Sequence, residues 1–356
     1  MVIKLEKEYN LGGLVKPLCL WYEKNKRSMP WREDASPYHV WLSEIMLQQT
    51  RIEAAKSYYE RFIKALPDVQ ALADVSEEEL LKLWEGLGYY NRARNLKKTA
   101  EILVQKYAGK LPASYDMLVK LPGIGNYTAG AIASIAYGLP APAVDGNVLR
   151  VAMRYLNCRD HIMKQSVRKK MERAVMDVIP EKHPGEFNQA LMELGEVVCI
   201  PNGKPFCHQC PLSDRCLAHA AGTEQELPVR PEKKQRRIEN RTILLLEKED
   251  KIGIVKRPEH GLLGGLWEFP GMEGHKTLTE LRVWLEKQGI TGCEVKRLKG
   301  GKHVFSHVEW HMRGYQLKLN EKQQDIVPEL EWVNKTELEK RYAIPVAFHI
   351  FLHQID

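Results

Sequence analysis

The chain has 356 residues, a formal net charge of +7 and an isoelectric point near 8.9. This length exceeds one ordinary hydrophobic core and suits two domains. No apolar run is long enough to span a bilayer, and the start, MVIKLEKEYN, lacks the apolar stretch of a signal peptide, so we expect a cytoplasmic protein with no membrane partner. The positive charge is a weak indication of a polyanionic partner, and a reducing cytoplasm disfavours disulfides.

Residues 14 to about 219 show the period of amphipathic helices. Apolar residues recur three and four positions apart in segments such as VWLSEIML, ELLKLWEGL and AGAIASIAYGL. Prolines and glycines separate these segments, and we find no convincing strand pattern among them. The N-terminal part, residues 1–228, is therefore predicted to be an all-α domain.

A tight turn between two helices is predicted within residues 121–136, LPGIGNYTAGAIASIA. Gly123 and Gly125 allow the backbone to turn sharply and to approach a phosphate, which N–H groups at the start of the next helix can bind. This is the helix–hairpin–helix pattern. A Gly-x-Gly turn alone is weak support for it, because many ordinary helix–helix turns contain glycine.

Four of the seven cysteines lie close together, at Cys199, Cys207, Cys210 and Cys216. Zinc ribbons usually pair two C-x2-C knuckles, whereas this loop has one knuckle with longer, unequal arms. Four thiolates in one short loop suit an iron–sulfur cluster, in which each iron takes one thiolate. The spacing favours such a cluster moderately, and a structural zinc remains the alternative.

The composition changes after residue 228. Residues 229–237 are rich in basic side chains and are predicted to form an exposed linker. Beyond it, RTILLLEKEDKIGIVKR indicates two strands, TLTELRVWLEKQG a helix and HVEWHMRGYQLKL a further strand. Residues 238–356 are therefore predicted to form an α+β domain.

Several motifs together give the chain a family resemblance. They are PWR (30–32), WLSEIMLQQT (41–50), EGLGYY (85–90), LPGIGNYTAGA (121–131), AVDGNVLR (143–150), FNQALMELG (187–195), the cysteine loop, WEFPG (267–271) and FSH (305–307). With them the chain resembles the helix–hairpin–helix DNA glycosylase superfamily and, within it, the adenine DNA glycosylases of the MutY family along nearly its whole length. One departure is the first cysteine gap, which is one residue longer than is usual in the family.

The resemblance implies a monofunctional enzyme that removes adenine opposite 8-oxoguanine or guanine in double-stranded DNA, after flipping the base out of the helix. It also implies one 4Fe-4S cluster on the four cysteines, and we expect a monomer that is associated with the nucleoid if the source is bacterial. A related glycosylase acting on thymine mismatches or oxidised pyrimidines is the first alternative. A non-catalytic DNA-binding iron–sulfur protein is the second.

Cleavage of an N-glycosidic bond needs an acid for the leaving base and an anion that stabilises an oxocarbenium-like cation. Glu44 lies on a mostly apolar helix face, where burial would raise its pKa, and the resemblance assigns it the acid role. Asp145 is assigned the anion, although its position equally fits a helix N-cap, with Asn147 as a rival cap. The family resemblance includes Asn147 in the catalytic group.

Tyr127 occupies the position at which bifunctional relatives carry a lysine that forms a Schiff base. A tyrosine has no amine for that chemistry, so we expect water to be the nucleophile. The sequence leaves open whether water attacks directly or after a covalent intermediate on Asp145.

The resemblance also assigns contacts with the substrate and the DNA. The adenine pocket takes Trp31, Arg32, Leu47 and Gln189, while Gln49 and Tyr89 fill or wedge the duplex. Further DNA contacts are Thr50, Leu87, Gly88, Gly123 and Gly125.

The C-terminal part resembles a Nudix domain that has lost its magnesium ligands. Active Nudix enzymes carry R-E-x-x-E-E, and the matching residues 282–287 read RVWLEK, so only Glu286 remains. Divalent magnesium needs several oxygen ligands, so we expect no catalytic magnesium here. The resemblance assigns recognition of 8-oxoguanine to Phe305, Ser306 and His307, although packing is an alternative role for such residues.

Overall fold

The structure is a computed structural model that describes residues 9–231, 235–320 and 329–355. The chain divides into two compact units: unit 1 comprises residues 1–74 and 95–232, and unit 2 comprises 75–94 and 233–356. The predicted boundaries at 228 and 238 treat 75–94 as part of the first domain, so the two divisions differ in that segment. Residues 232–234 of the predicted linker lie outside the described residues.

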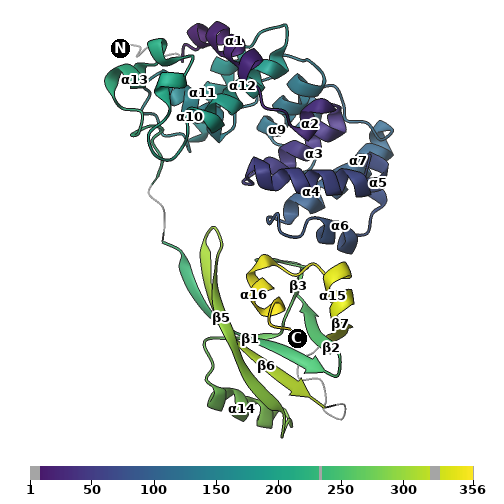
Figure 1. Cartoon of the computed structure of the whole chain (residues 1–356). Coiled ribbons are helices and arrows are strands. Elements are labelled where there is room, and N and C mark those ends of the chain that lie inside the picture. Colours follow the sequence, from purple (N-terminus) through teal and green to yellow (C-terminus); the bar gives the residue numbers. More distant parts are fainter. Residues whose placement is uncertain (1–8, 232–234, 321–328, 356) are drawn as a thin grey trace, which may run out of the picture. The chain divides into compact units, whose positions relative to one another are not determined.

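Unit 1 consists of helices, and its described residues contain no strand, which confirms the all-α prediction (Figure 1). The helices are α1 (Val15–Asn25), α2 (Pro30–Glu33), α3 (Pro37–Leu47), α4 (Ile52–Ala65), α5 (Val69–Asp74), α7 (Asn91–Tyr107), α8 (Tyr115–Leu118), α9 (Asn126–Ala131), α10 (Gly146–Tyr155), α11 (Gln165–Met176), α12 (Pro184–Val197) and α13 (Leu217–Ala221). The first residues of α7, up to Arg94, are grouped with unit 2.

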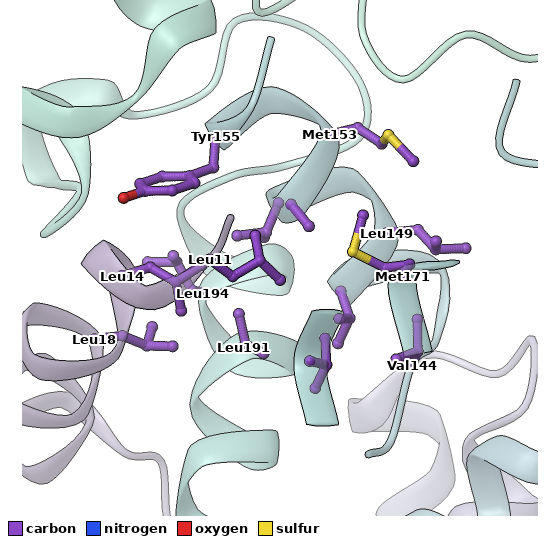
Figure 2. Packing of buried hydrophobic residues seen from close by; sticks show 14 of the residues in the cluster. Leu11, Leu14, Leu18, Val144, Leu149, Met153, Tyr155, Met171, Leu191 and Leu194 are labelled. Carbon is purple, nitrogen blue, oxygen red and sulfur yellow. The ribbon is translucent and has the colours of Figure 1, made fainter. Parts of the chain in front are cut away.

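One core of unit 1 lies where α1, α10, α11 and α12 meet. Leu14, Leu149, Met171 and Leu194 come from four separate segments and are fully buried there (Figure 2). Their spacing places apolar side chains on one face of each helix, so burial of these faces joins the N-terminal helix to helices more than a hundred residues later.

The hairpin turn follows α8 and leads into α9. Gly123 has φ +75°, and a Cβ atom at this position would lie 2.7 Å from Cβ of Asn95, so both conformation and space require glycine. Gly125 differs, because its φ is −90° and no atom lies within 4 Å of the site of a Cβ. After α9 the helix widens into a π-type turn over Ile132–Ala136.

Unit 2 contains a mixed sheet, which confirms the α+β prediction (Figure 1). Its elements are β1 (Arg237–Lys248), β2 (Lys251–Lys256), β3 (Trp267–Glu268), β4 (Gly271–Glu273), β5 (Glu294–Val304), β6 (Val308–Leu319), β7 (Glu331–Asn334), α14 (Leu278–Lys287), α15 (Lys335–Arg341), α16 (His349–Leu352) and, from the earlier segment, α6 (Glu77–Leu83). The strand order is β3-β2-β1-β6-β5, with β4 on β1 and β7 on β2. Only β1 and β6 run parallel among the described pairs.

Both faces of this sheet are covered. Leu244 and Leu246 of β1 pack with Leu281 of α14 in one apolar cluster, while Ile243 and Leu245 belong to a second cluster that includes the α16 region. Successive residues of a strand point to opposite faces, so the continuous apolar run of β1 fits a central strand buried on both sides. No helix among the described residues is long and apolar enough to cross a membrane.

Candidate active site

A cavity of about 1380 Å³ in unit 1 brings together most of the side chains that the sequence assigned to catalysis and the adenine pocket. Its walls come from α2, α3, α9, the start of α10, and α12. The predicted residues that line it are Trp31, Arg32, Glu44, Leu47, Gln49, Thr50, Gly125, Tyr127, Asp145, Asn147 and Gln189.

Glu44 is a buried carboxyl on α3, and its side chain borders this cavity with an exposed fraction of 7% for the residue. The pKa of Glu44 is raised to about 7, mainly by burial and in smaller part by the negative charge of Asp145. The hydrogen bond from Tyr127 and the positive charge of Arg32 act in the opposite direction and lower it. The Tyr127 hydroxyl donates to Oε2 of Glu44 and also contacts the sulfur of Met192, at 3.3 Å. A carboxyl with this pKa can hold a proton near neutral pH.

Asp145 is the N-cap of α10, and it also lines the cavity. Its Oδ1 accepts from the backbone N–H groups of Asn147 at 2.8 Å and Val148 at 2.7 Å. Its Oδ2 accepts from the side-chain amide of Asn147 at 2.8 Å. Burial raises the pKa of Asp145 above its ordinary value, and these three donors, which stabilise the anion, offset part of that rise.

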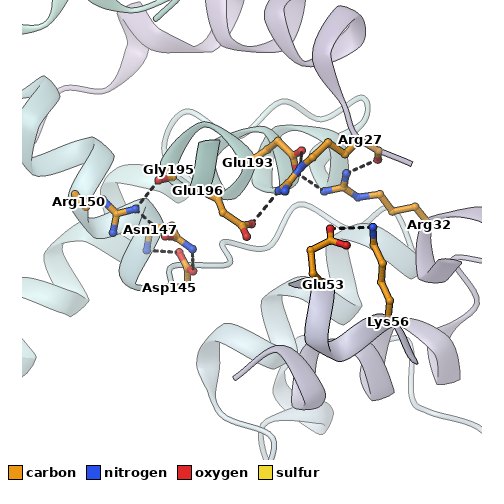
Figure 3. Close-up of polar contacts among 10 residues, drawn as sticks. All are labelled: Arg27, Arg32, Glu53, Lys56, Asp145, Asn147, Arg150, Glu193, Gly195 and Glu196. Atoms are coloured by element: carbon orange, nitrogen blue, oxygen red, sulfur yellow. Dashed lines mark hydrogen bonds and ion pairs between the residues drawn. The ribbon is translucent and has the colours of Figure 1, made fainter. Parts of the chain in front are cut away.

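Asn147 is fixed from the other side by α12 and by a buried arginine (Figure 3). Arg150 donates to Oδ1 of Asn147 at 2.8 Å, to the carbonyl of Gly195 at 2.6 Å and to the carbonyl of Cys199 at 2.7 Å. A Cβ atom at Gly195 would lie 2.7 Å from Cβ of Asn147, so glycine allows α12 to approach this closely. The helix thus determines how the Asn147 amide faces Asp145.

The four cysteines of the loop are each partly buried, and they lie close enough for their thiols to influence one another electrostatically. Cys199 follows α12, and Cys216 is the N-cap of α13. Burial raises the pKa of Cys207 to about 11 and of Cys210 to about 12, and each of these two thiols also feels the charge of the other cysteines. Arg154 donates to the Cys199 sulfur at 3.2 Å.

The spacing of the four sulfur atoms bears on which metal group they fit. Four thiolates around one zinc ion lie about 3.8 Å apart, since each bond is about 2.3 Å in a tetrahedron. Among the described residues, the group of three potential ligands whose atoms all lie within 4.8 Å of one another is Cys207, His219 and Glu224, and it contains only one cysteine. In the described part of the chain, no three of these cysteine sulfurs form a group within 4.8 Å of one another, as thiolates around one zinc ion would.

The remaining predicted DNA contacts lie in unit 2, except Gly123 in the hairpin turn. Tyr89 is exposed, has φ +48°, and its hydroxyl lies 2.7 Å from Oγ of Ser306. The structure therefore places the predicted wedge residue next to a predicted reader of 8-oxoguanine. Phe305 packs edge-on against Trp310, with ring centroids 4.9 Å apart, and His307 is exposed.

The backbone before Tyr89 is held by interactions within the same segment. Leu87 is buried, and Gly88 has φ +68°. The Arg92 side chain donates to the carbonyls of Leu87 and Gly88, at 3.0 and 3.1 Å, and the indole N–H of Trp84 also donates to Gly88. This turn thus presents Tyr89 in a left-handed conformation, which non-glycine residues rarely adopt.

Among the residues that the sequence analysis missed, four contact the assigned side chains. Arg27, Met192 and Glu193 line the cavity, and Arg150 holds Asn147. For Glu193 a signal existed, because it follows Gln189 by one helical turn and so shares its face of α12. Arg27 gave no comparable signal, since it lies in a polar loop ahead of α2.

Comparisons with known proteins agree with this geometry. A family model for the "HhH-GPD superfamily base excision DNA repair protein" matches residues 42–177, and a "NUDIX domain" model matches residues 241–354. A thermostable thymine-DNA glycosylase is similar in structure, with 27% sequence identity and a TM-score of 0.53 over 58% of this chain and 95% of that chain. Fold and site therefore define a base excision repair DNA glycosylase of the helix–hairpin–helix class, with an added Nudix-like domain.

Two relatives narrow this class further. The chain is 34% identical to the adenine DNA glycosylase of Buchnera aphidicola subsp. Acyrthosiphon pisum (strain APS), over 84% of this chain and 85% of the relative. It is also 34% identical to the adenine DNA glycosylase of Mus musculus, over 85% of this chain and 70% of the relative. The chain belongs to the adenine DNA glycosylase family.

Proposed function

We propose that this chain removes adenine mispaired with 8-oxoguanine or guanine from double-stranded DNA, and that it hydrolyses the N-glycosidic bond without cutting the strand. The observation that carries the proposal is the pair of carboxyl groups in one cavity. Glu44 is poised to hold a proton near neutral pH, and Asp145 is surrounded by donors that favour its anion. Acid and anion are the two groups that the reaction needs.

In this proposal Glu44 protonates the flipped adenine, and electrons of the N-glycosidic bond leave with the base. Tyr127 donates to Oε2 of Glu44, which leaves Oε1 to carry the transferable proton. Asp145 stabilises the sugar cation, and Asn147 keeps the Asp145 carboxylate oriented. A water molecule then adds to the sugar cation and gives up one proton to the Glu44 carboxylate. Tyr127 itself offers no amine, so no Schiff base forms at this position.

The assigned pocket residues orient adenine beside Glu44. The Gln189 amide offers a donor and an acceptor to a purine edge, and Trp31 forms an apolar wall. Gln49, which is exposed with φ +59°, and Thr50 occupy the end of α3, where a strained residue suits insertion into DNA. The turn at Gly123 and Gly125 is assigned to a phosphate.

Cys199, Cys207, Cys210 and Cys216 would hold one 4Fe-4S cluster. Thiols with raised pKa values need a metal group to keep them ionised, and binding then couples to folding of the loop. The cluster supplies no step of base removal in this proposal. Its expected effects are on folding and DNA binding.

Recognition of 8-oxoguanine is assigned to the 305–307 segment of unit 2. The Ser306 hydroxyl can donate and accept, which suits an edge where oxidation adds an oxygen at C8 and a hydrogen at N7. Tyr89, which lies beside Ser306, would wedge the duplex. We expect no magnesium chemistry, because the segment matching the Nudix motif lies in α14 with Glu286 as its single glutamate.

One experiment tests the proposal. Duplexes that contain 8-oxoguanine:A, G:A, G:T or thymine glycol are incubated with excess protein, and strands are analysed with and without hot alkali. We expect alkali-dependent cuts at adenine in the first two duplexes alone, and none with the Glu44→Gln variant. Processing of G:T or thymine glycol in preference to adenine would support the thymine or pyrimidine alternative. Strand cuts without alkali, with a borohydride-trapped adduct, would contradict the monofunctional assignment.

A further inference from the structure

Glu193 is a buried carboxylate for which neither the sequence motifs nor the proposed chemistry gives a role. It lies on α12 with an exposed fraction of 2%. Its Oε1 accepts from Nε of Arg27, and its Oε2 accepts from Nη2 of Arg32 at 2.8 Å. Figure 3 shows both guanidinium groups converging on this one carboxylate.

The two arginines are joined to each other as well as to Glu193. Nη1 of Arg32 donates to the backbone carbonyl of Arg27 at 2.8 Å. The second guanidinium nitrogen of Arg27 reaches the more exposed carboxylate of Glu196 at 2.9 Å, whereas Arg32 also stacks over the ring of Tyr22 at 5.7 Å. Glu193 is thus the carboxylate that contacts both arginines at once.

Arg32 faces a second buried carboxyl, that of Glu44. Both residues line the cavity, and the charge of Arg32 acts on Glu44 in the direction that favours loss of its proton. The other groups that act on Glu44 are the Tyr127 hydroxyl from α9 and the Asp145 carboxylate at the start of α10. A closer approach of Arg32 to Glu44 would therefore favour loss of the Glu44 proton.

The groups that surround Glu193 are Arg27 and Arg32, with Tyr22 from α1 nearby. Burial alone would raise the pKa of Glu193, but the contacts with the two arginines outweigh burial and hold the pKa below its ordinary value, which favours the anion. Removal of one partner from a buried ion pair leaves the other charge uncompensated. In this case Arg27 would keep its pair with Glu196, whereas Arg32 would lose its ion pair with Glu193 at the edge of the adenine pocket.

We propose that Glu193 is a positioning residue of the active site, which holds Arg27 and Arg32 on the pocket wall and prevents Arg32 from pairing with Glu44. The inference rests on the proposed acid role of Glu44. Glu193 touches neither the base nor the sugar in this proposal, and it acts through the arginines. A purely structural ion pair between the loop before α2 and α12 is the competing explanation.

The test measures the protonation of Glu44 directly, without substrate. Protein with ¹³C-labelled glutamate carboxyls is titrated by NMR, and the Glu44 signal is identified by its loss in Glu44→Gln. In Glu193→Gln we expect the Glu44 titration to move down by about one pH unit, since an uncompensated opposite charge nearby typically lowers a carboxyl pKa by one to three units. A Glu44 titration that stays at its wild-type midpoint would overturn the proposal.

Two control variants distinguish the effect of the contact between Glu193 and Arg32 from the effect of removing a negative charge. Glu53→Gln changes the exposed Glu53–Lys56 pair, drawn beside the site in Figure 3, and should leave the titration unchanged. Glu196→Gln removes the carboxylate that pairs with Arg27 alone and should move it much less than Glu193→Gln. An equal movement in Glu196→Gln would show that regional charge, and not the contact with Arg32, sets the protonation of Glu44.

Activity gives the second readout. In Glu193→Gln, the pH above which single-turnover excision slows should lie about one unit lower than in wild type. At a pH above both midpoints, the variant should therefore excise about tenfold more slowly than wild type. If Glu193→Gln fails to fold, as a circular dichroism spectrum would show, Glu193→Asp replaces it. Aspartate keeps the negative charge, but its shorter side chain moves the carboxylate oxygens away from the arginines. The Glu44 titration should then move down by less than in Glu193→Gln. The NMR titration uses no DNA, so its result does not depend on the assignment of adenine as the substrate. Failure of this inference can therefore be distinguished from failure of the proposed function.

Discussion

Replacement of Glu44 by glutamine should change the pH dependence of stability as well as activity. Burial raises the pKa of Glu44 to about 7 from its ordinary value of 4.5. The folded protein therefore binds a proton that the unfolded chain releases between these two values, so this group's contribution to stability is lost as pH rises through them. The full difference corresponds to about 3 kcal/mol, at about 1.4 kcal/mol per unit of pKa.

Glutamine has no such titration, so Glu44→Gln should gain stability relative to wild type as pH rises. Between about pH 5.5 and 8.5 the relative gain should be roughly 2 kcal/mol, because part of the loss has already occurred at the lower pH. Urea unfolding of both proteins, followed by the circular dichroism of the helices, measures it. Other titrating groups cancel in the comparison. A stability difference that stays constant across this range would refute the argument that Glu44 keeps its proton near neutral pH.

Four further predictions concern single side chains of the site. Tyr127→Phe removes a hydrogen-bond donor that favours the ionised form of Glu44. The pH above which single-turnover excision slows should therefore rise by about one to two units, and a decrease in that pH would contradict the prediction. Gly195→Ala would push on Asn147 across 2.7 Å and should slow excision by about 10²-fold, while DNA binding measured by gel shift persists. Cys210→Ser should lower the iron content and the DNA affinity more than the rate of bound substrate; stoichiometric zinc without iron in anaerobically purified wild type would refute the cluster assignment. Ser306→Ala should narrow the preference for 8-oxoguanine:A over G:A by roughly one decade at fixed salt, and an equal fall on both substrates would assign this segment to scaffolding.

Periodicity and motifs predicted the two fold classes, and the residues that the motifs assigned to catalysis and the adenine pocket line one cavity. The apolar face around Glu44 indicated a buried carboxyl, and the position of Asp145 before a helix indicated a cap. These features are local, because three or four neighbours along the chain determine them.

The remaining features depend on contacts between distant segments. Glu193 forms its ion pairs with Arg27 and Arg32, which lie more than 160 positions earlier in the chain, because the fold brings these segments together. The grouping of residues 75–94 with unit 2 likewise arises from contacts with residues far along the chain, so composition gave no sign of it. The left-handed conformation of Tyr89 has no sequence signal, since that conformation is uncommon for a tyrosine.

The parallel pairing of β1 with β6 has a consequence for synthesis of the protein. Each residue of β1 pairs with one 71 positions further along, from Arg237 with Val308 to Lys248 with Leu319. During translation β1 is therefore synthesised well before β6, and its apolar edge stays unpaired until β6 emerges. The helices of unit 1 are already complete at that stage. A chain that stops before Val308 would leave that edge unpaired, and an exposed apolar strand edge is a template for aggregation. Late truncations should thus deplete the whole enzyme from the cell, including a helical unit that the truncation itself leaves intact.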